Sequence, residues 1–355
     1  MSEPLRILSV DGGGVRGLIP AEVLAELEKR LAVRVKAPAR LSDYFHLFAG
    51  TSTGGLISLA LTAPGGPPAT KLPDLYTVDG PKIFKRSHFG TIFNPIGIFG
   101  PIYGAGGLQS SLEERLGPSR LSQATRDLLV TAYDMTKREP FFFTRWQALK
   151  DPSRDYPIVD AGLATSAAPT YFPSHGVKVG GEAEPRALVD GGVFADDPSI
   201  AAIAEALGRA KDPPAELTPQ DLFMVSLGTG RYVPGYRQSD ISGWGKIRWA
   251  VLGEEPPLIS AMLNGSADGA DYWTHMLLNH APGDEPPGSA AIGHGPRYFR
   301  LQVDLPSEVT MDNASSQVLD VTLPAAAKQL ITTHDADLNA IVDKLAEAGP
   351  IPPLP

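Results

Sequence analysis

The sequence predicts an α/β protein built on a mostly parallel sheet that is covered by helices on both faces. Short apolar runs alternate with segments of helical periodicity along most of the chain. Two of these runs lead directly into glycine-rich turns, at residues 11–17 and 50–55. Parallel strands are buried on both faces and therefore read as continuous apolar stretches. With 355 residues, 43% of them hydrophobic, the chain can bury a large core.

The first unit is predicted to be a strand, a glycine loop and a helix. Residues 5–10 (LRILSV) form the strand, and DGGGVRG follows at residues 11–17. Pro20 suits the first turn of a helix, and apolar side chains then recur at helical spacing through PAEVLAELEKRL.

A second unit repeats this scheme, and further strands follow it. The run at residues 45–49 leads into GTSTGG and then into a helical segment at residues 56–62. Residues 127–133 (DLLVTAY) and 222–227 (LFMVSL) read as further buried strands. The apolar run ending at Asp190 delivers that aspartate to a glycine turn.

Three segments depart from the alternation. Residues 89–107 are apolar but rich in glycine and proline, which excludes a regular helix or a central strand and suggests a lid or an acyl-binding wall, or an ordinary covering loop. Residues 242–262 predict an imperfectly amphipathic helix. The tail at residues 349–355, GPIPPLP, is expected to be disordered, which leaves a single domain over residues 1–348.

Composition excludes several classes of function. The net charge is −9 and the pI about 5.3, which argues against a nucleic-acid polymer held by phosphate contacts. Cysteine is absent, so disulfides, thiolate metal sites and a cysteine nucleophile are excluded. The N-terminus lacks the features of a signal peptide, and no apolar run approaches the ~20 residues that span a bilayer. We therefore expect a soluble, cytoplasmic protein.

The motif GTSTGG places Ser52 at a predicted strand-to-helix turn. A chance G-x-S-x-G is common in a chain this rich in glycine, so its position matters more than the pattern. A nucleophile elbow needs such a turn, because the sharp bend exposes the serine above the sheet and at a helix N-terminus. We predict that Ser52 is a nucleophile on an elbow formed by four neighbours: Gly50, Thr51, Thr53 and Gly54.

The first glycine loop is predicted to stabilise an oxyanion. Gly12, Gly13 and Gly14 offer backbone N–H groups without obstructing side chains. The loop also matches the dinucleotide fingerprint G-x-G-x-x-G, but Asp11 would repel a pyrophosphate and the acidic residue expected about 20 positions later is missing. A sugar-kinase-like phosphate loop, which also places Asp before glycines, is the other alternative.

A serine nucleophile needs a base. The sequence has seven histidines, none of them in a motif that marks it as catalytic. Asp190, followed by Gly191 and Gly192, is the better candidate, because burial without a nearby cation would raise its pKa and make it a stronger base. The alternative is that Asp190 only caps a turn.

Together these motifs resemble the patatin-like phospholipase family. The resemblance rests on VDGGGVRG at 10–17, GTSTGG at 50–55, ATSAAPTYFP at 164–173, VDGG at 189–192, SLGTG at 226–230 and YFRLQVDL at 298–305. It implies a three-layer α/β/α fold and a Ser52–Asp190 dyad without histidine, metal or cofactor. It also implies an oxyanion hole from the glycine loop, with Arg16 close by. Where the family commonly has Asn-Asn-Pro, this chain has Asp196-Asp197-Pro198.

The resemblance implies a lipid acyl hydrolase of the phospholipase A type that contacts the membrane peripherally, at the inner membrane of a bacterium. Trp244, Ile247 and Trp249, with Lys246 and Arg248, would touch an anionic lipid surface, unless they belong to an ordinary packed surface helix. One alternative is an effector phospholipase in anti-phage defence that a cyclic dinucleotide activates. The other is a catalytically silent lipid-binding protein.

Overall fold

The computed structural model describes residues 3–85, 100–209, 217–232, 235–250, 257–280 and 295–354. Its strands, in chain order, are β1 (Leu5–Val10), β2 (Leu47–Thr51), β3 (Asp127–Asp134), β4 (Glu139–Thr144), β5 (His175–Val177), β6 (Arg186–Asp190), β7 (Leu222–Leu227) and β8 (Tyr298–Leu301). Within the described ranges these strands form one sheet with the order β5-β6-β3-β2-β1-β7-β8, and β4 also pairs with β3.

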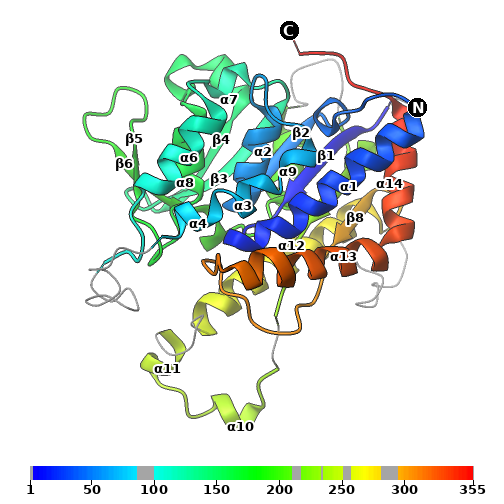
Figure 1. Ribbon diagram of the computed structural model, residues 1–355. Helices are drawn as coiled ribbons and strands as arrows, with labels where there is room; N and C mark the ends of the chain where they lie inside the picture. Colours follow the sequence, from blue (N-terminus) through cyan, green and yellow to red (C-terminus); the bar gives the residue numbers. More distant parts are fainter. Residues whose placement is uncertain are drawn as a thin grey trace.

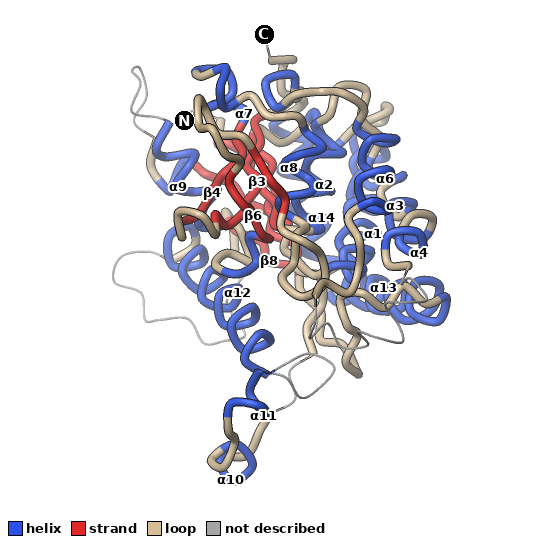
Figure 2. The backbone as a smooth tube through the Cα atoms, turned by 90° about the vertical axis from the view of Figure 1, so that its left-hand side faces the viewer, coloured by secondary structure: helices blue, strands red, loops and turns tan. Residues whose placement is uncertain are grey.

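Helices cover both faces of this sheet (Figures 1 and 2). One face packs against α1 (Leu18–Val35), α2 (Thr53–Thr62), α6 (Gly106–Leu116), α8 (Ile158–Thr165), α13 (Leu323–Thr333) and α14 (Asp335–Ala348). The other packs against α9 (Ser199–Arg209) and α12 (Pro257–Leu278). The remaining short helices are α3 (Asp74–Thr77), α4 (Gly80–Ile83), α7 (Arg145–Lys150), α10 (Gln238–Ile241) and α11 (Lys246–Ala250). The predicted α/β/α architecture is confirmed.

The centre of the sheet is parallel, and its first unit is the predicted strand, glycine loop and helix. β1 pairs in parallel with β2 and β7, β2 with β3, and β7 with β8. β1 and β7 have the predicted bounds. Each mostly apolar run leads into a glycine-rich turn, which marks the end of the strand clearly in the sequence. β2 is displaced two residues from the predicted run, and α2 begins at Thr53, directly after Ser52.

Strand β6 is antiparallel, and this determines where Asp190 lies. β3 pairs with β2 through residues 127–131 and with β6 through residues 132–134, while β4 pairs with β3 at residues 129–134. Since β4 occupies one edge of β3 across both stretches, β2 and β6 share the other edge. They run toward each other along it, with Thr51 opposite Thr131 and Asp190 opposite Ala132. The ends of β2 and β6 therefore meet.

Two sequence expectations differ from the structure. The helix predicted over residues 242–262 does not begin until Lys246, where α11 starts, since residues 242–245 form a turn; residues 251–256 lie outside the described residues, and α12 begins at Pro257. The end of the chain is not disordered through Ile351, whose N–H donates to the Asp43 carbonyl at 2.7 Å. Buried arginines explain the order of this tail: Arg6 donates to the Gly349 carbonyl at 2.6 Å and Arg126 to that of Ile351 at 3.0 Å. The single domain over residues 1–348 stays a prediction.

Most of the segment at residues 89–107, predicted to be a lid or an acyl-binding wall, lies outside the described residues, which resume at Gly100. Residues 100–105 form no helix or strand, and α6 begins at Gly106. No helix in the described ranges is long and apolar enough to cross a bilayer.

Candidate active site

Ser52 lies on a strained bend between β2 and α2. Its φ is 52° and its ψ −121°, a region that costs a residue with a side chain about 1–3 kcal/mol. The flanking glycines make the bend feasible: a Cβ on Gly50 would overlap the Gly54 carbonyl, and one on Gly54 would overlap the Val10 carbonyl. Backbone therefore packs directly on backbone around Ser52, as the predicted elbow requires.

Neighbouring hydroxyls hold this bend in place. The Ser52 N–H donates to Thr165 Oγ1 at 2.8 Å, at the end of α8. Thr51 Oγ1 lies 2.7 Å from Thr131 Oγ1 and donates to the Ala195 carbonyl at 2.6 Å. Thr53 Oγ1 shares a hydrogen bond of 2.6 Å with the Tyr76 hydroxyl. Hydrogen bonds to four different segments thus offset the cost of the strained backbone.

Asp190 reaches Ser52 from the end of β6. Its side chain is 5% exposed, and its carboxyl accepts a hydrogen bond from the Gly192 N–H at 2.8 Å. Burial raises the pKa of Asp190 to about 6, and the neighbouring Ser52 hydroxyl and Gly192 N–H oppose the rise. The aspartate therefore both caps its turn and faces the serine. An aspartate with a pKa near 6 is a stronger base than an exposed one.

No described histidine lines either cavity at Ser52. His46 accepts from the Arg6 N–H at 3.0 Å, where β2 begins, at the end of the strand away from the serine. His175 and His334 lie 2.9 Å and 2.8 Å from Asp160 and Asp337, respectively. His88 and His294 fall outside the described residues.

The glycine loop differs from the prediction at Gly12. Its N–H donates to the Asp196 carbonyl at 3.0 Å and so is occupied. Gly13 and Gly14 have φ values of 148° and 59°, and their N–H groups have no acceptor among the described residues. The first-turn N–H of Thr53, at the start of α2, also lacks an intrahelical acceptor. The amides available for an oxyanion are thus those of Gly13, Gly14 and Thr53.

Arg16 contacts the glycine loop through its Nε, and its predicted place in the oxyanion hole stays a prediction. Its Nε donates to the Gly13 carbonyl at 3.4 Å, so it helps to fix the direction of the neighbouring amides. Thr229, from the SLGTG motif after β7, donates to the Gly12 carbonyl at 2.6 Å. Both contacts hold loop carbonyls, which leaves N–H groups free to face a substrate.

A buried ionic cluster holds Asp11, the residue that precedes the glycine loop. Arg300 on β8 binds both carboxylate oxygens of Asp11, at 2.8 and 2.5 Å, and lies 3.4 Å from Asp197. Asp197 also accepts from the Ser199 N–H at 2.8 Å, at the start of α9. Because Arg300 holds Asp11, that carboxylate is occupied by a structural partner. The sequence placed Arg300 in the motif YFRLQVDL but gave it no role, because its partner Asp11 is far away in the chain.

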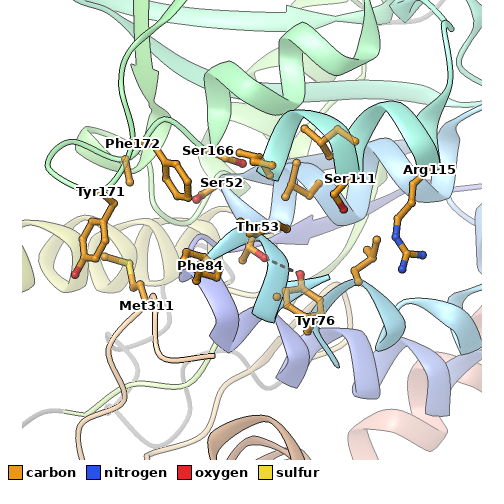
Figure 3. A pocket seen from close by; sticks show the side chains of 18 of the residues that line it. Ser52, Thr53, Tyr76, Phe84, Ser111, Arg115, Ser166, Tyr171, Phe172 and Met311 are labelled. Carbon is orange, nitrogen blue, oxygen red and sulfur yellow. Dashed lines mark hydrogen bonds between the residues drawn. The ribbon is translucent and has the colours of Figure 1, made fainter. Parts of the chain in front are cut away.

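Two cavities meet at Ser52. One, of about 80 Å³, is bordered by α2, α4 and α6, and its lining is mostly apolar, with Ser111 and Arg115 among the polar side chains (Figure 3). The other, of about 190 Å³, contains the carboxyls of Asp190 and Asp196 and reaches α12 through apolar side chains. Tyr171 and Met311 border both. The motif ATSAAPTYFP, for which the sequence left packing and active-site roles open, thus contributes cavity wall and the support of Ser52.

Comparison with known proteins identifies the family. The family model for patatin-like phospholipase matches residues 8–203. "Patatin-like protein 2" of Arabidopsis thaliana is 36% identical over 89% of this chain and 79% of its own length. "Patatin-T5" of Solanum tuberosum is 34% identical over 71% of this chain and 68% of its own length. The chain belongs to the patatin-like phospholipase family. Members of this family are serine hydrolases that act on lipids.

Membership alone does not show that a patatin-like chain is active. Another relative, 35% identical over 89% of this chain and 83% of its own length, is "Probable inactive patatin-3-Kuras 1" of Solanum tuberosum. Among solved structures, VipD from Legionella pneumophila covers 94% of this chain and 67% of its own at 13% identity, but its TM-score of 0.43 carries no argument. A bacterial source, a cyclic dinucleotide activator and a role in anti-phage defence find no support in these comparisons and stay predictions.

Proposed function

We propose that this patatin-like protein hydrolyses acyl esters of membrane lipids, as a phospholipase A-type enzyme, with Ser52 as nucleophile and Asp190 as base. The observation that carries the proposal is that the strained Ser52 and the buried Asp190 carboxyl lie side by side in one cavity, at a point where two largely apolar cavities meet. A serine so placed can attack an ester carbonyl while its proton passes to the aspartate.

The reaction proceeds in two steps. The Ser52 oxygen attacks the carbonyl carbon as its proton passes to Asp190, and the amides of Gly13, Gly14 and Thr53 bind the oxyanion. The tetrahedral intermediate then collapses, the carbon–oxygen bond to the alcohol breaks, and Asp190 protonates the departing oxygen. In the second step water loses a proton to Asp190 and attacks the acyl-serine ester, which releases the fatty acid and restores the Ser52 hydroxyl.

The dyad is tested by substitution and by covalent labelling. We expect Ser52→Ala and Asp190→Asn each to lower kcat for a micellar phospholipid by at least about a thousandfold, because both proton transfers pass through this pair. A fluorophosphonate probe should label wild-type protein at Ser52, as read by peptide mass spectrometry. Ser153→Ala and Asp343→Asn, at exposed positions, serve as matched controls.

Two results would contradict this assignment. Wild-type turnover in either dyad variant would exclude the proposed roles. A folded wild-type protein with neither turnover nor labelling would favour the catalytically silent lipid-binding alternative.

We further propose that the projecting arm around α10 and α11 contacts the lipid surface. The arm extends away from the body of the molecule beside the start of α12 (Figures 1 and 2). Tyr236 and Trp249 pack edge-on against Trp244, at 5.0 and 5.3 Å, and Arg248 lies 4.9 Å from the Trp244 ring. Met262, 55% exposed, lies on α12 and also borders the larger cavity. Because α11 contacts α12, the arm lies next to a helix that borders the larger cavity at Ser52.

The charge of the arm favours an anionic bilayer as its partner. Residues 235–250 carry Arg237, Lys246 and Arg248 against a single carboxylate, Asp240, in a chain whose net charge is −9. Basic residues beside aromatic side chains are typical of segments that lie in a membrane interface.

Liposome flotation tests the arm. We expect the double variant Trp244→Ser/Trp249→Ser to lose at least about tenfold in affinity for phosphatidylglycerol vesicles while it still hydrolyses a water-soluble ester. Val33→Ser, which removes an exposed apolar side chain from α1, is the control. Unchanged vesicle binding by the double variant would remove the arm from the interface.

A further inference from the structure

A second carboxyl, that of Asp196, lies at the active site without a role in the dyad. Asp196 borders the larger cavity together with Ser52 and Asp190. Its Oδ1 occupies the space that a Cβ on Gly12 would need, and lies 3.4 Å from the position of a Cβ on Gly192. A Cβ on Gly12 would in turn lie 3.4 Å from the Ser52 Cβ. The Asp196 carboxyl thus stands beside both the oxyanion loop and the serine.

The departing alcohol leaves Ser52 on the same side as Asp196. Asp190 must protonate the leaving oxygen, so the alcohol has to leave toward the cavity that Asp190 borders. The other cavity is bordered by neither Asp190 nor Asp196 and has Leu56, Leu108 and Leu112 among its walls, which suits an acyl chain. This division follows from the proton transfer and from the position of the two carboxyls.

The charges around Asp196 do not fix it as a carboxylate. Burial raises its pKa to about 7; Arg16 and Arg300 act to lower that pKa, and the carboxylates of Asp190 and Asp197 act to raise it. Asp11 lies close enough to interact with it as well. Arg300 is bound to Asp11, and the Nε of Arg16 donates to the Gly13 carbonyl. Asp196 is therefore largely protonated in mild acid and gains charge as the pH rises above neutrality.

We propose that Asp196 determines specificity, by favouring lipids whose leaving alcohol is uncharged over lipids whose leaving alcohol is anionic. The proposal rests on the hydrolysis proposed above and names its preferred substrates as neutral glycerolipids. An anionic headgroup that enters the larger cavity meets a like charge, and the repulsion opposes both binding and departure of the alcohol. The discrimination strengthens with pH, because Asp196 repels anions only when ionised.

The test compares two lipids with the same acyl chains in micelles of a neutral detergent, which removes any effect of bilayer charge. Dioleoylglycerol has a neutral leaving alcohol, and dioleoylphosphatidylglycerol has a phosphodiester that stays ionised throughout. We expect the ratio of their kcat/KM values, neutral over anionic, to rise about tenfold between about pH 5.5 and about pH 8.5 in the wild type. Titration of Asp190 cancels in this ratio, because both substrates use the same base.

Asp196→Asn is expected to make that ratio independent of pH and close to the wild-type value in acid. Asp343→Asn makes the same change of net charge at an exposed site that pairs with Arg34, and it should keep the wild-type pH dependence. A purely structural role for Asp196 would lower both kcat/KM values in Asp196→Asn and leave the pH dependence of their ratio intact, which would overturn the proposal.

The pH dependence of the wild-type ratio alone is also enough to test the role of Asp196. A ratio that stays constant with pH in an active wild type overturns the role of Asp196 even if Asp196→Asn fails to fold, and leaves the dyad untouched. Full activity of Ser52→Ala would instead overturn the proposed hydrolysis itself, so the two failures are distinguishable.

Discussion

The two cavities that meet at Ser52 have different walls. The smaller is enclosed by α2, α4 and α6, and its one ionic group, Arg115, pairs with Asp79 at the far end from the serine (Figure 3). The larger is bordered by two carboxyls, a glycine turn and α12. On the proposed mechanism, the smaller cavity would hold the acyl chain, while the larger would exchange protons and discriminate charge. An ester placed across Ser52 would have its two halves sorted by these walls.

The largest effect in this comparison is expected from filling the apolar side. Ala60 lies on α2 and borders a cavity of about 80 Å³. Ala60→Phe would occupy much of that volume, so we expect kcat/KM for an oleoyl ester to fall about a hundredfold and that for a butyryl ester to change far less. A series of 4-nitrophenyl esters of increasing chain length measures the shift.

Leu112→Ala is the matched control, because it enlarges the cavity that Ala60→Phe fills. It should move the optimum toward longer chains, at a cost in stability of about 2–5 kcal/mol. If Ala60→Phe lowers activity equally for short and long esters, the acyl chain does not enter this cavity and the assignment of the two sides is reversed or wrong.

A smaller effect is expected at the larger cavity, where the ionisation of Asp190 changes the free energy of unfolding rather than the substrate specificity. The pKa of Asp190 is raised from 3.8 to about 6, chiefly by burial. The folded state therefore binds this proton more tightly than the unfolded chain. The stability associated with it is complete below pH 3.8, falls as the pH rises to about 6, and is lost above that, a total of about 3 kcal/mol.

Asp190→Asn removes this cost. Chemical denaturation should show the variant to be more stable than the wild type by roughly 1–3 kcal/mol near pH 8, with a difference that shrinks toward pH 4. Asp343→Asn, at an exposed position, should show no such pH-dependent gain. A variant that is less stable than the wild type at both pH values would mean that the carboxylate is stabilised in the fold rather than tolerated.

Local sequence signals predicted most of the fold and much of the candidate site. The strands β1 and β7 have the expected bounds because each mostly apolar run leads into a glycine-rich turn. Ser52 lies on the expected bend, which Gly50 and Gly54 permit because a Cβ on either would overlap neighbouring backbone. Asp190 was predicted as the partner of the serine from its run and turn, and in the structure both residues border the same cavity.

What the sequence could not predict depends on partners distant in the chain. Nothing local indicates that β6 is antiparallel, since that direction is set by pairing with β3. Gly12 is indistinguishable from Gly13 until the Asp196 carbonyl occupies its N–H. The sequence predicts a disordered tail at residues 349–351 because the donors to its carbonyls, Arg6 and Arg126, are far away in the chain. In each case a hydrogen bond over a long sequence separation decides the outcome.

The head-on meeting of β2 and β6 along one edge of β3 has a consequence for how the enzyme stays ready to react. Asp190 is the last residue of its strand and Ser52 is the first residue after its strand, and both strands pair with the same neighbour, β3. The sheet therefore holds the backbones of the two residues at one place before any ligand enters.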